Sequence, residues 1–387
     1  MKRSEILIVL GLIAFGLIFQ LLDSGKNPAG INAGEPLRNL LRGPVERIEK
    51  PVITHTPAKR ILIVNPAGDM TFRNNETGAL EILPTVECYN TSAGEARKMA
   101  DQVTIAGKIR ADGTIAIQTD IPGRYGFKQL RVRLDIRLPR DVPLDVYSRH
   151  GIIQMDHLQN PSRINVSRGD LEAVHHASTL YVQHTHGRVQ LSDMQDALDI
   201  HTSFSKLTVR HCRNVGVKGH HSRILLEQVR GDVVVLNRHE RVEMNDVQGN
   251  VNLQVSDAPV SLSRIDAVTL AIKSDYKSLR GRSLSVSSLD AMVSHGDLDF
   301  EFARLTDTLS IKARHSDLRL SIPGDTDPQL HVQLKYGRFT NRSPLKARIT
   351  RSRTMQQVNS DGETPVIVVD GRYCDVILSQ SSPLSID

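Results

Sequence analysis

The sequence contains no tryptophan, and aromatic residues make up only 4% of its 387 positions. Hydrophobic residues reach 39%, and many of them are valine, isoleucine and leucine, which suit pleated sheets better than helix bundles. The sequence has no glycine-rich phosphate loop, nucleophile elbow or zinc motif. We therefore expect an all-β protein without catalytic residues, a metal site or a cofactor.

Cysteine is scarce, and Cys88, Cys212 and Cys374 lie far apart in the sequence. Their number is odd, and no two of them have the paired spacing of a metal site. We interpret them as small buried side chains. A disulfide between two of them stays open, because the sequence does not define a pairing.

Along most of the chain, neither basic nor acidic residues form a cluster of one sign. The sequence has 49 Lys and Arg and 43 Asp and Glu, which give a net charge of +6 and a pI near 9.2. Basic and acidic residues are interspersed, so the balance permits weak attraction to anionic polymers and does not predict nucleic-acid binding.

One long hydrophobic run is present, at the amino end of the chain. It extends from Ile6 to Leu22, is interrupted only by Gln20, and follows Lys2 and Arg3. A helix of this length spans about 25 Å, near the lower limit for crossing a bilayer. The run is longer than a cleavable signal core, and no good cleavage site follows it closely. We therefore prefer an uncleaved transmembrane helix over a signal peptide.

This expected anchor, residues 1–23, predicts the location of the protein. Positive residues stay on the cytoplasmic side, so we expect a single-pass inner-membrane protein that contacts the lipid bilayer through residues 6–22, with its body in the periplasm. Residues 24–58 contain five prolines and several glycines. This composition cannot sustain a helix or a central strand, and we interpret the segment as a linker.

The rest of the chain repeats a pattern of two short strands. Within residues 141–387, Leu180 and Val182 are followed by Val189 and Leu191, and similar sets recur mostly every 16 to 21 residues. Alternation on both sides of a bend means that one face of each strand is buried. Such short repeats must stack to bury that face, so the sequence predicts a parallel β-helix-like, single-chain β-solenoid with coils of about 18 residues.

A ring recurs six residues after most strand starts, at the bend of the coil. Equal positions in successive coils lie one above another, so we expect a ring column along one corner. Asp257 occupies one level, and the coil that begins near Ile164 has no clear member. The members of the ring column are His150, His186, Phe204, His221, His239, Tyr276, His295, His315, Tyr336 and Tyr373.

Three interpretations of the ring column stay open. Histidines of adjacent coils, such as His221 and His239, are near enough to share a metal ion, or to repel one another when protonated, in which case stability falls between about pH 7 and 5. Tyrosine and phenylalanine also occupy the column, which a metal site would not tolerate. We therefore favour a structural column packed over a tight turn.

Other histidine clusters resemble metal ligands. They are His175-His176, His220-His221 and His184-Thr185-His186. Neighbouring side chains of a strand point to opposite faces, so we expect each doublet to divide between the inside and the outside of the solenoid.

Residues 59–140 differ from the repeat. They read as strands around RILIVNPAGDMTF, DQVTIAGKI, TIAIQT and LRVRLDIRLP, with a short helical piece at Glu95 to Asp101. An exposed terminal sheet edge would invite aggregation. We therefore interpret this segment as the first coils and the cap of the same solenoid.

The segments ILIVNPAGDM, GEARKMADQ and LRVRLDIRLPRDVPLDVYSRHGIIQM, with the coils that follow, resemble the bacterial putative-adhesin domain family over residues 59–380. The resemblance lies in alternation, turns and small residues, and it is strongest where Leu138-Pro139 passes into the LDV segment. It implies a non-enzymatic envelope β-solenoid outside the cytoplasm, usually attached to a membrane. The family supplies no catalytic residues.

Some parallel β-helices are polysaccharide lyases or hydrolases, which need clustered acidic or basic groups in a groove. The candidates in this chain look like solvated turn positions, so an enzyme is the weakest alternative. These candidates are Asp193, Asp196, Asp199, Asp297 and Asp317.

A binding, adhesin-like rod or envelope scaffold fits the sequence best. A self-assembling bactofilin-like rod needs uncapped ends, and a lipid conduit needs an open apolar groove. The basic insert, residues 341–364, carries Lys346, Arg348, Arg351 and Arg353. These four side chains are the candidate contact for an anionic polysaccharide, with a solvated loop as the alternative. The expected partners are an envelope protein or this polysaccharide; the sequence leaves the oligomeric state open.

Overall fold

The computed structural model describes residues 45–56, 59–126 and 128–380, with Glu46–Asp387 forming one compact unit. Within this part of the chain, no helix is both long and apolar enough to cross a membrane. The expected anchor, residues 1–23, and residues 24–44 of the expected linker lie outside the described residues.

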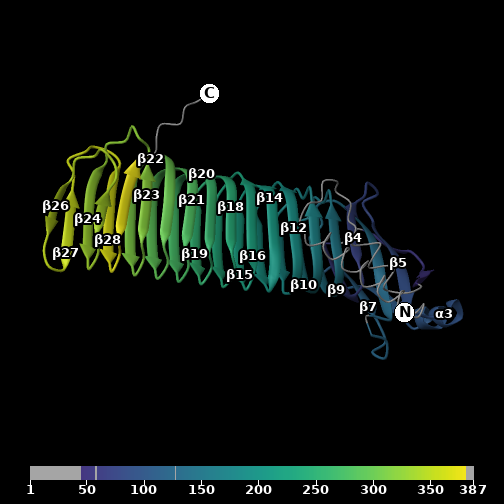
Figure 1. The fold of residues 1–387 in the computed structure, drawn as a ribbon. Coiled ribbons are helices and arrows are strands. Elements are labelled where there is room, and N and C mark those ends of the chain that lie inside the picture. The colour runs from purple at the N-terminus through teal and green to yellow at the C-terminus, as the bar shows by residue number, and fades with distance from the viewer. Residues whose placement is uncertain (1–44, 57–58, 127, 381–387) are drawn as a thin grey trace, which may run out of the picture. The chain divides into compact units, whose positions relative to one another are not determined.

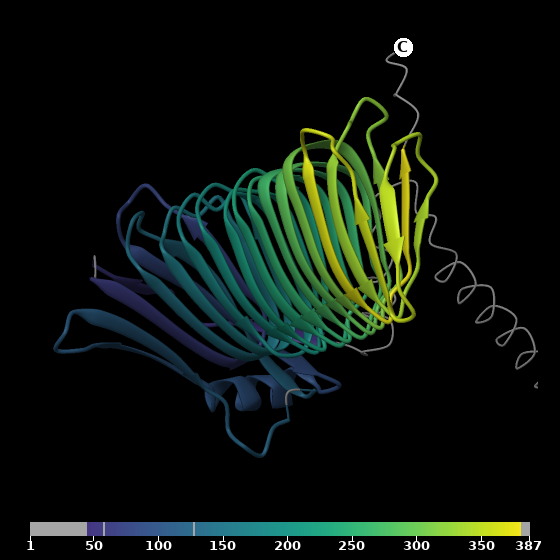
Figure 2. The ribbon, with the colours of Figure 1, turned by 90° about the vertical axis from the view of Figure 1, so that its left-hand side faces the viewer.

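The compact unit is a β-solenoid with about nine turns and coils of about 19 residues. Each coil contributes one strand to sheet 1, turns at a first corner, contributes one strand to sheet 2, and turns again at a second corner. Five long strands, β9, β10, β20, β21 and β22, bend around a corner and belong to both sheets. Figure 1 shows the successive coils side by side along the solenoid, and Figure 2 shows them stacked behind one another.

The parallel strands of both sheets follow the expected two-strand repeat. In spatial order, sheet 1 consists of β7 (Thr114–Asp120), β3 (Arg60–Ala67), β9 (Leu144–Asp156), β10 (Ser162–Val174), β11 (Leu180–His184), β13 (Leu198–Ser203), β15 (Val215–His220), β17 (Val233–Arg238), β19 (Val251–Ser256), β20 (Val260–Asp275), β21 (Leu279–Ser294), β22 (Leu298–Arg314), β28 (Val366–Arg372) and β24 (Gln329–Lys335). Sheet 2 consists of β8 (Leu130–Leu138), β4 (Met70–Asn74), β9, β10, β12 (Gly187–Met194), β14 (Ser205–Cys212), β16 (Arg223–Val229), β18 (Val242–Gln248), β20, β21, β22, β23 (Leu318–Ile322), β29 (Val376–Gln380) and β25 (Phe339–Asn341).

The core lies between the two sheets and is one continuous cluster of aliphatic side chains. Strand alternation produces it, as in β17, where Val233 and Val235 are buried and Val234 and Leu236 are exposed. The three cysteines are buried, as expected, and all three are free thiols. Burial in the core raises the pKa of Cys212 to about 12.

Chain order and spatial order differ at both ends of the solenoid. At the N-terminal end, β3 pairs with both β7 and β9. β3 therefore lies nearer to the middle of the stack than β7, although it precedes β7 in the sequence. At the C-terminal end, β28 pairs with both β22 and β24 (Figure 1). The last coil therefore inserts between two earlier coils rather than adding to the end of the stack.

Antiparallel strands cover both ends. β6 (Thr104–Ile109) lies against β7, β5 (Leu80–Tyr89) lies against β8, and β27 (Met355–Asn359) lies between β24 and β26 (Arg348–Arg351). The expected short helix is α3 (Ala93–Asp101), whose first turn is capped by the Ser92 hydroxyl, 3.4 Å from the backbone nitrogen of Glu95.

The expected linker contains two strands where it is described. β1 (Val45–Glu49) and β2 (Ile53–His55) both pair with β5. Pro51 lies between these two edge strands, where a missing backbone donor is tolerated. Proline content therefore excluded a central strand here, but not an edge strand.

The first corner is built in two ways along the solenoid. In the early coils, Gly68, Gly151, Gly169 and Gly187 have φ between 129° and 148°. From Phe204 onward, the member of the ring column takes the left-handed conformation instead, with φ between 50° and 75°. In the coil near Ile164 the register begins at Ser162, and Arg168, not a ring, pairs with His150 at the ring position.

Candidate binding site on sheet 1

The structure stacks most members of the ring column at the first corner. Neighbouring rings lie within 15° of parallel, with centroids 4.3–5.2 Å apart. Asp257 interrupts the column; its carboxylate lies 3.4 Å from His239 Nδ1 and 3.4 Å from Lys277 Nζ. The stacked pairs are His186–Phe204, Phe204–His221, His221–His239, Tyr276–His295, His295–His315, His315–Tyr373 and Tyr373–Tyr336.

The ring column lies on the outside of the solenoid, since side chains such as Phe204 and Tyr276 are more than half exposed. A left-handed conformation costs a non-glycine residue roughly 1–2 kcal/mol. Each ring contact contributes about 0.5–1.5 kcal/mol beyond burial. Stacking therefore offsets much of the strain of the corner.

One of the two histidine doublets, His175-His176, divides as expected. His176 and His184 are buried, whereas His175 and His186 are exposed. The prediction is wrong for His220-His221, whose rings both lie at the surface, 4.3 Å apart. The reason is that His221 has φ of 50°, and a left-handed residue breaks the alternation of strand faces.

Acidification should destabilise the fold through the inward histidine His176. Burial lowers its pKa to about 4, below the value near 6.5 of an unfolded chain. The unfolded state therefore takes up the proton first, and stability should fall by about 3 kcal/mol as pH drops from about 6.5 to 4. Thermal unfolding across this range should show the loss. His176→Gln should make the melting temperature depend less on pH, whereas His186→Gln, at an exposed position, should not. If the melting temperature falls equally with pH in the unchanged protein and in both variants, His176 is not the cause of the loss.

Three cations lie in register beside the C-terminal rings. Arg314 pairs with Arg372, and Arg372 pairs with Lys335, on the adjacent strands β22, β28 and β24. The Arg372 and Lys335 side chains also lie over the rings of the next residues, Tyr373 and Tyr336, at 5.5 and 5.6 Å. Because β28 inserts between β22 and β24, only the folded chain brings these three residues together.

These cations line a hollow of about 540 Å³ on the outer face of sheet 1. Lys273 and Lys312 also line it, together with Asp275 and Asp370, so basic side chains outnumber acidic ones. We call these five cations the cationic hollow: Lys273, Lys312, Arg314, Lys335 and Arg372. All five are exposed, and none forms an ion pair with another residue in the described part of the chain.

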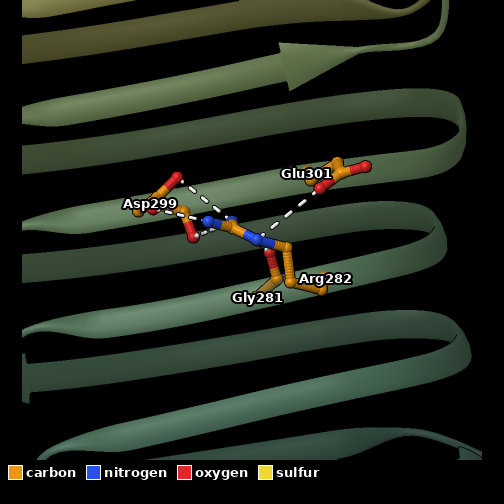
Figure 3. A network of polar contacts seen from close by, with 4 residues as sticks. All are labelled: Gly281, Arg282, Asp299 and Glu301. Atoms are coloured by element: carbon orange, nitrogen blue, oxygen red, sulfur yellow. Dashed lines mark hydrogen bonds and ion pairs between the residues drawn. The ribbon is translucent and has the colours of Figure 1, made fainter. Parts of the chain in front are cut away.

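Arg282 on sheet 2 provides a contrast. Its guanidinium donates to both carboxylate oxygens of Asp299, at 3.1 and 2.7 Å, and lies 3.5 Å from Glu301 (Figure 3). The hydrogen bond to Asp299 raises the pKa of Arg282, and the same contact lowers the pKa of Asp299. The cations of the hollow have no comparable partners among the described residues, so their charge is available to a ligand.

The basic insert is not a single surface. Lys346 lines a different hollow, which also contains Asp325, Asp327 and Asp361. Arg348 pairs with Asn359 and Arg351 pairs with Gln356, so strand alternation turns these two arginines to opposite faces.

Arg353 lies in the turn that precedes β27. Thr354 of this turn accepts a hydrogen bond from the backbone N–H of Tyr336. The turn that contains Arg353 therefore contacts the chain one residue after Lys335.

The acidic residues considered for catalysis are distributed over several places. The Asp297 carboxylate accepts a hydrogen bond of 3.1 Å from the backbone N–H of Asp317. The Asp317 carboxylate accepts one of 3.2 Å from the backbone N–H of Asp375. Asp193 and Asp196 line a hollow at the second corner, and Asp199 lies in β13 on sheet 1. Asp297 and Asp317 thus tie successive coils together at turns.

Comparisons with known proteins give one family. The family description Toastrack DUF4097 matches residues 60–371. No curated protein matches the chain.

Three solved structures are similar to it. A putative cell adhesion protein from Clostridium sporogenes is 8% identical, with 87% of this chain and 100% of the other covered and a TM-score of 0.22. A putative adhesin from Parabacteroides distasonis is 9% identical, with 86% and 97% covered and a TM-score of 0.25. A putative adhesin from Bacteroides fragilis is 9% identical, with 86% and 98% covered and a TM-score of 0.18. Because the family match runs from β3 to β28 and spans nearly all of both sheets, the chain belongs to the Toastrack DUF4097 family.

Proposed function

We propose that the protein is a non-enzymatic, adhesin-like binding module that holds an anionic envelope polysaccharide in the cationic hollow. Its body stands outside the cytoplasm, anchored to the inner membrane by residues 6–22. The observation that carries this proposal is the register of Arg314, Arg372 and Lys335 on three adjacent strands.

Like charges directly opposite one another in a sheet are destabilising. Strands lie about 4.8 Å apart, so the three cations repel one another unless an anion lies over them. A polymer with regularly spaced acidic groups matches this row, and its charge would relieve the repulsion. Arginine and tyrosine side by side also offer a planar donor and an apolar ring to a sugar acid.

The ends of the solenoid favour a binding module over a self-assembling rod. A filament of stacked copies would continue the parallel sheets from one chain to the next. Within the described residues, sheet 1 ends on antiparallel β6 and β26, and β5 lies antiparallel on the N-terminal end of sheet 2. These strands cover three of the four sheet edges that such stacking would use, and the fourth edge is the three-residue strand β25.

Neutralising the row should weaken binding to an anionic polysaccharide. We expect the triple variant Arg314→Gln, Lys335→Gln, Arg372→Gln to bind alginate roughly tenfold less tightly than the unchanged full-length protein, because an exposed ion pair contributes about 0.5 kcal/mol. Co-sedimentation with alginate at low salt measures the affinity.

Two controls remove the same number of charges elsewhere. Arg97→Gln, Lys98→Gln, Arg110→Gln changes exposed residues at the N-terminal end, and Lys346→Gln, Arg348→Gln, Arg351→Gln changes the basic insert. Both should retain most of the affinity. Equal weakening in the N-terminal control would mean that net charge alone drives binding, and loss only in the insert variant would place the contact there.

A further inference from the structure

A second column runs along the second corner, where each coil passes from sheet 2 back to sheet 1. Its members share a left-handed conformation, with φ between 49° and 58°. They differ in chemistry, so no repeated residue type marks them in the sequence. The members are His157, His175, Asp193, His211, Gln228, Asp246, Arg264 and Ser283.

The first members of this column gather metal-ligating atoms. Asp156 ends β9, and its Oδ1 lies 2.6 Å from His157 Nδ1 and 3.9 Å from His175 Nδ1. The rings of His157 and His175 are stacked, with centroids 4.3 Å apart. One ligand atom from each of the three residues lies within 4.8 Å of the others.

We propose that Asp156, His157 and His175 bind a divalent transition-metal ion of the zinc class. A tetrahedral ion with ligands at about 2.1 Å needs its ligand atoms about 3.4 Å apart. The distances at Asp156 lie on both sides of this value, so shifts of about 0.5 to 0.8 Å through small side-chain rotations complete the set. Two imidazoles and one carboxylate suit zinc and its neighbours, with water in the fourth position.

The surroundings of the cluster support this assignment. The other nitrogen of His175, Nε2, lies 3.8 Å from Asp193, and Asp193 lies 3.5 Å from His211 Nδ1. A carboxylate beyond a metal-bound imidazole orients the ring and strengthens it as a ligand. His175, Asp193 and His211 also line a hollow of about 1040 Å³ at this corner, next to the proposed ligands Asp156 and His157, which do not line it.

A second group, His220, His221 and His239, also brings three ligand atoms within 4.8 Å of one another. None of its three ligand groups is a carboxylate that could balance the charge of a cation. Desolvation lowers the pKa of His220, and the neighbouring His221, His239 and Arg238 lower it further. The His221 and His239 rings are stacked, and so are the His157 and His175 rings, so the carboxylate of Asp156 is what distinguishes the two groups. The second corner is therefore the better site.

Calorimetric titration of the full-length protein, without a polyhistidine tag, with zinc chloride tests the proposal. We expect one ion per chain, and binding at least about tenfold weaker in His157→Asn and in His175→Asn. Asparagine tolerates the left-handed conformation, so these variants should keep the fold. His221→Asn is the matched control and should bind zinc like the unchanged protein.

Thermal unfolding provides a second measurement, since an ion that binds only the folded state raises the melting temperature. Zinc should raise it in the unchanged protein and in His221→Asn, but much less in His175→Asn. Absence of zinc binding would overturn the proposal. Loss of binding in His221→Asn with retention in His175→Asn would also overturn it, because the ion would then lie at the first corner.

Discussion

Deleting residues 362–387 should disorder more of the chain than it removes. The deletion takes away β28 and β29, which lie between earlier strands of both sheets. Ile367, Val369, Val376 and Leu378 are each 1% exposed, and burying such a side chain contributes about 1.5–3 kcal/mol. The loss, on the order of 6–12 kcal/mol, equals the stability of a typical domain. β24 and β27 lose their parallel support and should come apart.

Hydrogen exchange measures this effect strand by strand. In the shortened protein, amides of β24 and β27 should exchange quickly, while those of β15 and β17 stay protected. Deleting only residues 381–387 is the control, since it leaves every described strand in place. If the last coil instead lay at the end of the stack, β24 would keep its protection in both shortened proteins.

Gly169→Ala should strongly destabilise the first corner, although it adds only one methyl group. Gly169 has φ of 148°, and a Cβ there would lie 1.9 Å from the carbonyl oxygen of Gly151. That oxygen belongs to the backbone of the neighbouring coil, so relief requires the two coils to separate. Backbone strain of this kind costs about 1–3 kcal/mol, and overpacking adds a similar amount. We expect a loss of about 3 kcal/mol or more in urea unfolding.

Gly94→Ala is the matched control for this change. Gly94 lies in α3, and a Cβ there meets nothing within 4 Å. Alanine favours a helix over glycine by up to about 1 kcal/mol, so this variant should be as stable as the unchanged protein or slightly more so. Equal stability of the Gly169 and Gly94 variants would show that the coils at the first corner are not in close contact.

The solenoid could be predicted from the sequence because its cause is local. Alternation such as that of Leu180 and Val182, followed by a bend and a second pair, requires two buried faces in every coil. The helix α3 could also be predicted from the sequence, since its residues are good helix formers. The register of the coils was harder to predict. The apolar residue Ile164 looks like the start of its coil, yet the polar residue Ser162 is the one that pairs with Leu144 and Leu180, which start the neighbouring coils.

The order of the terminal coils depends on long-range pairing. Nothing near Val366 in the sequence specifies that β28 lies between β22 and β24, because all these strands have the same alternation. The cationic hollow depends on this insertion, as Arg314, Arg372 and Lys335 come from three separate repeats. The basic insert is the opposite case, since a cluster in sequence is dispersed when a strand turns alternate side chains to opposite faces.

The second column was missed for a different reason. A pattern of residue types reveals the ring column, whereas His157, Asp193 and Gln228 share only a backbone conformation. The useful signal would have been their spacing, which equals the length of one coil. Polar residues that recur once per coil can therefore mark a corner column even when the residue type changes from coil to coil.

The most direct test of the proposed binding function replaces Gln333 with a photo-reactive amino acid. Gln333 is exposed on the outer face of sheet 1 and lines the cationic hollow. Gln183, an exposed residue of the same sheet far from the hollow, is the control position. Full-length protein is irradiated in its native cells, and the adducts are identified by mass spectrometry. An acidic polysaccharide linked at Gln333 and not at Gln183 is the predicted result. Equal labelling at both positions, or linkage at Gln333 only to further copies of the chain, would contradict the account.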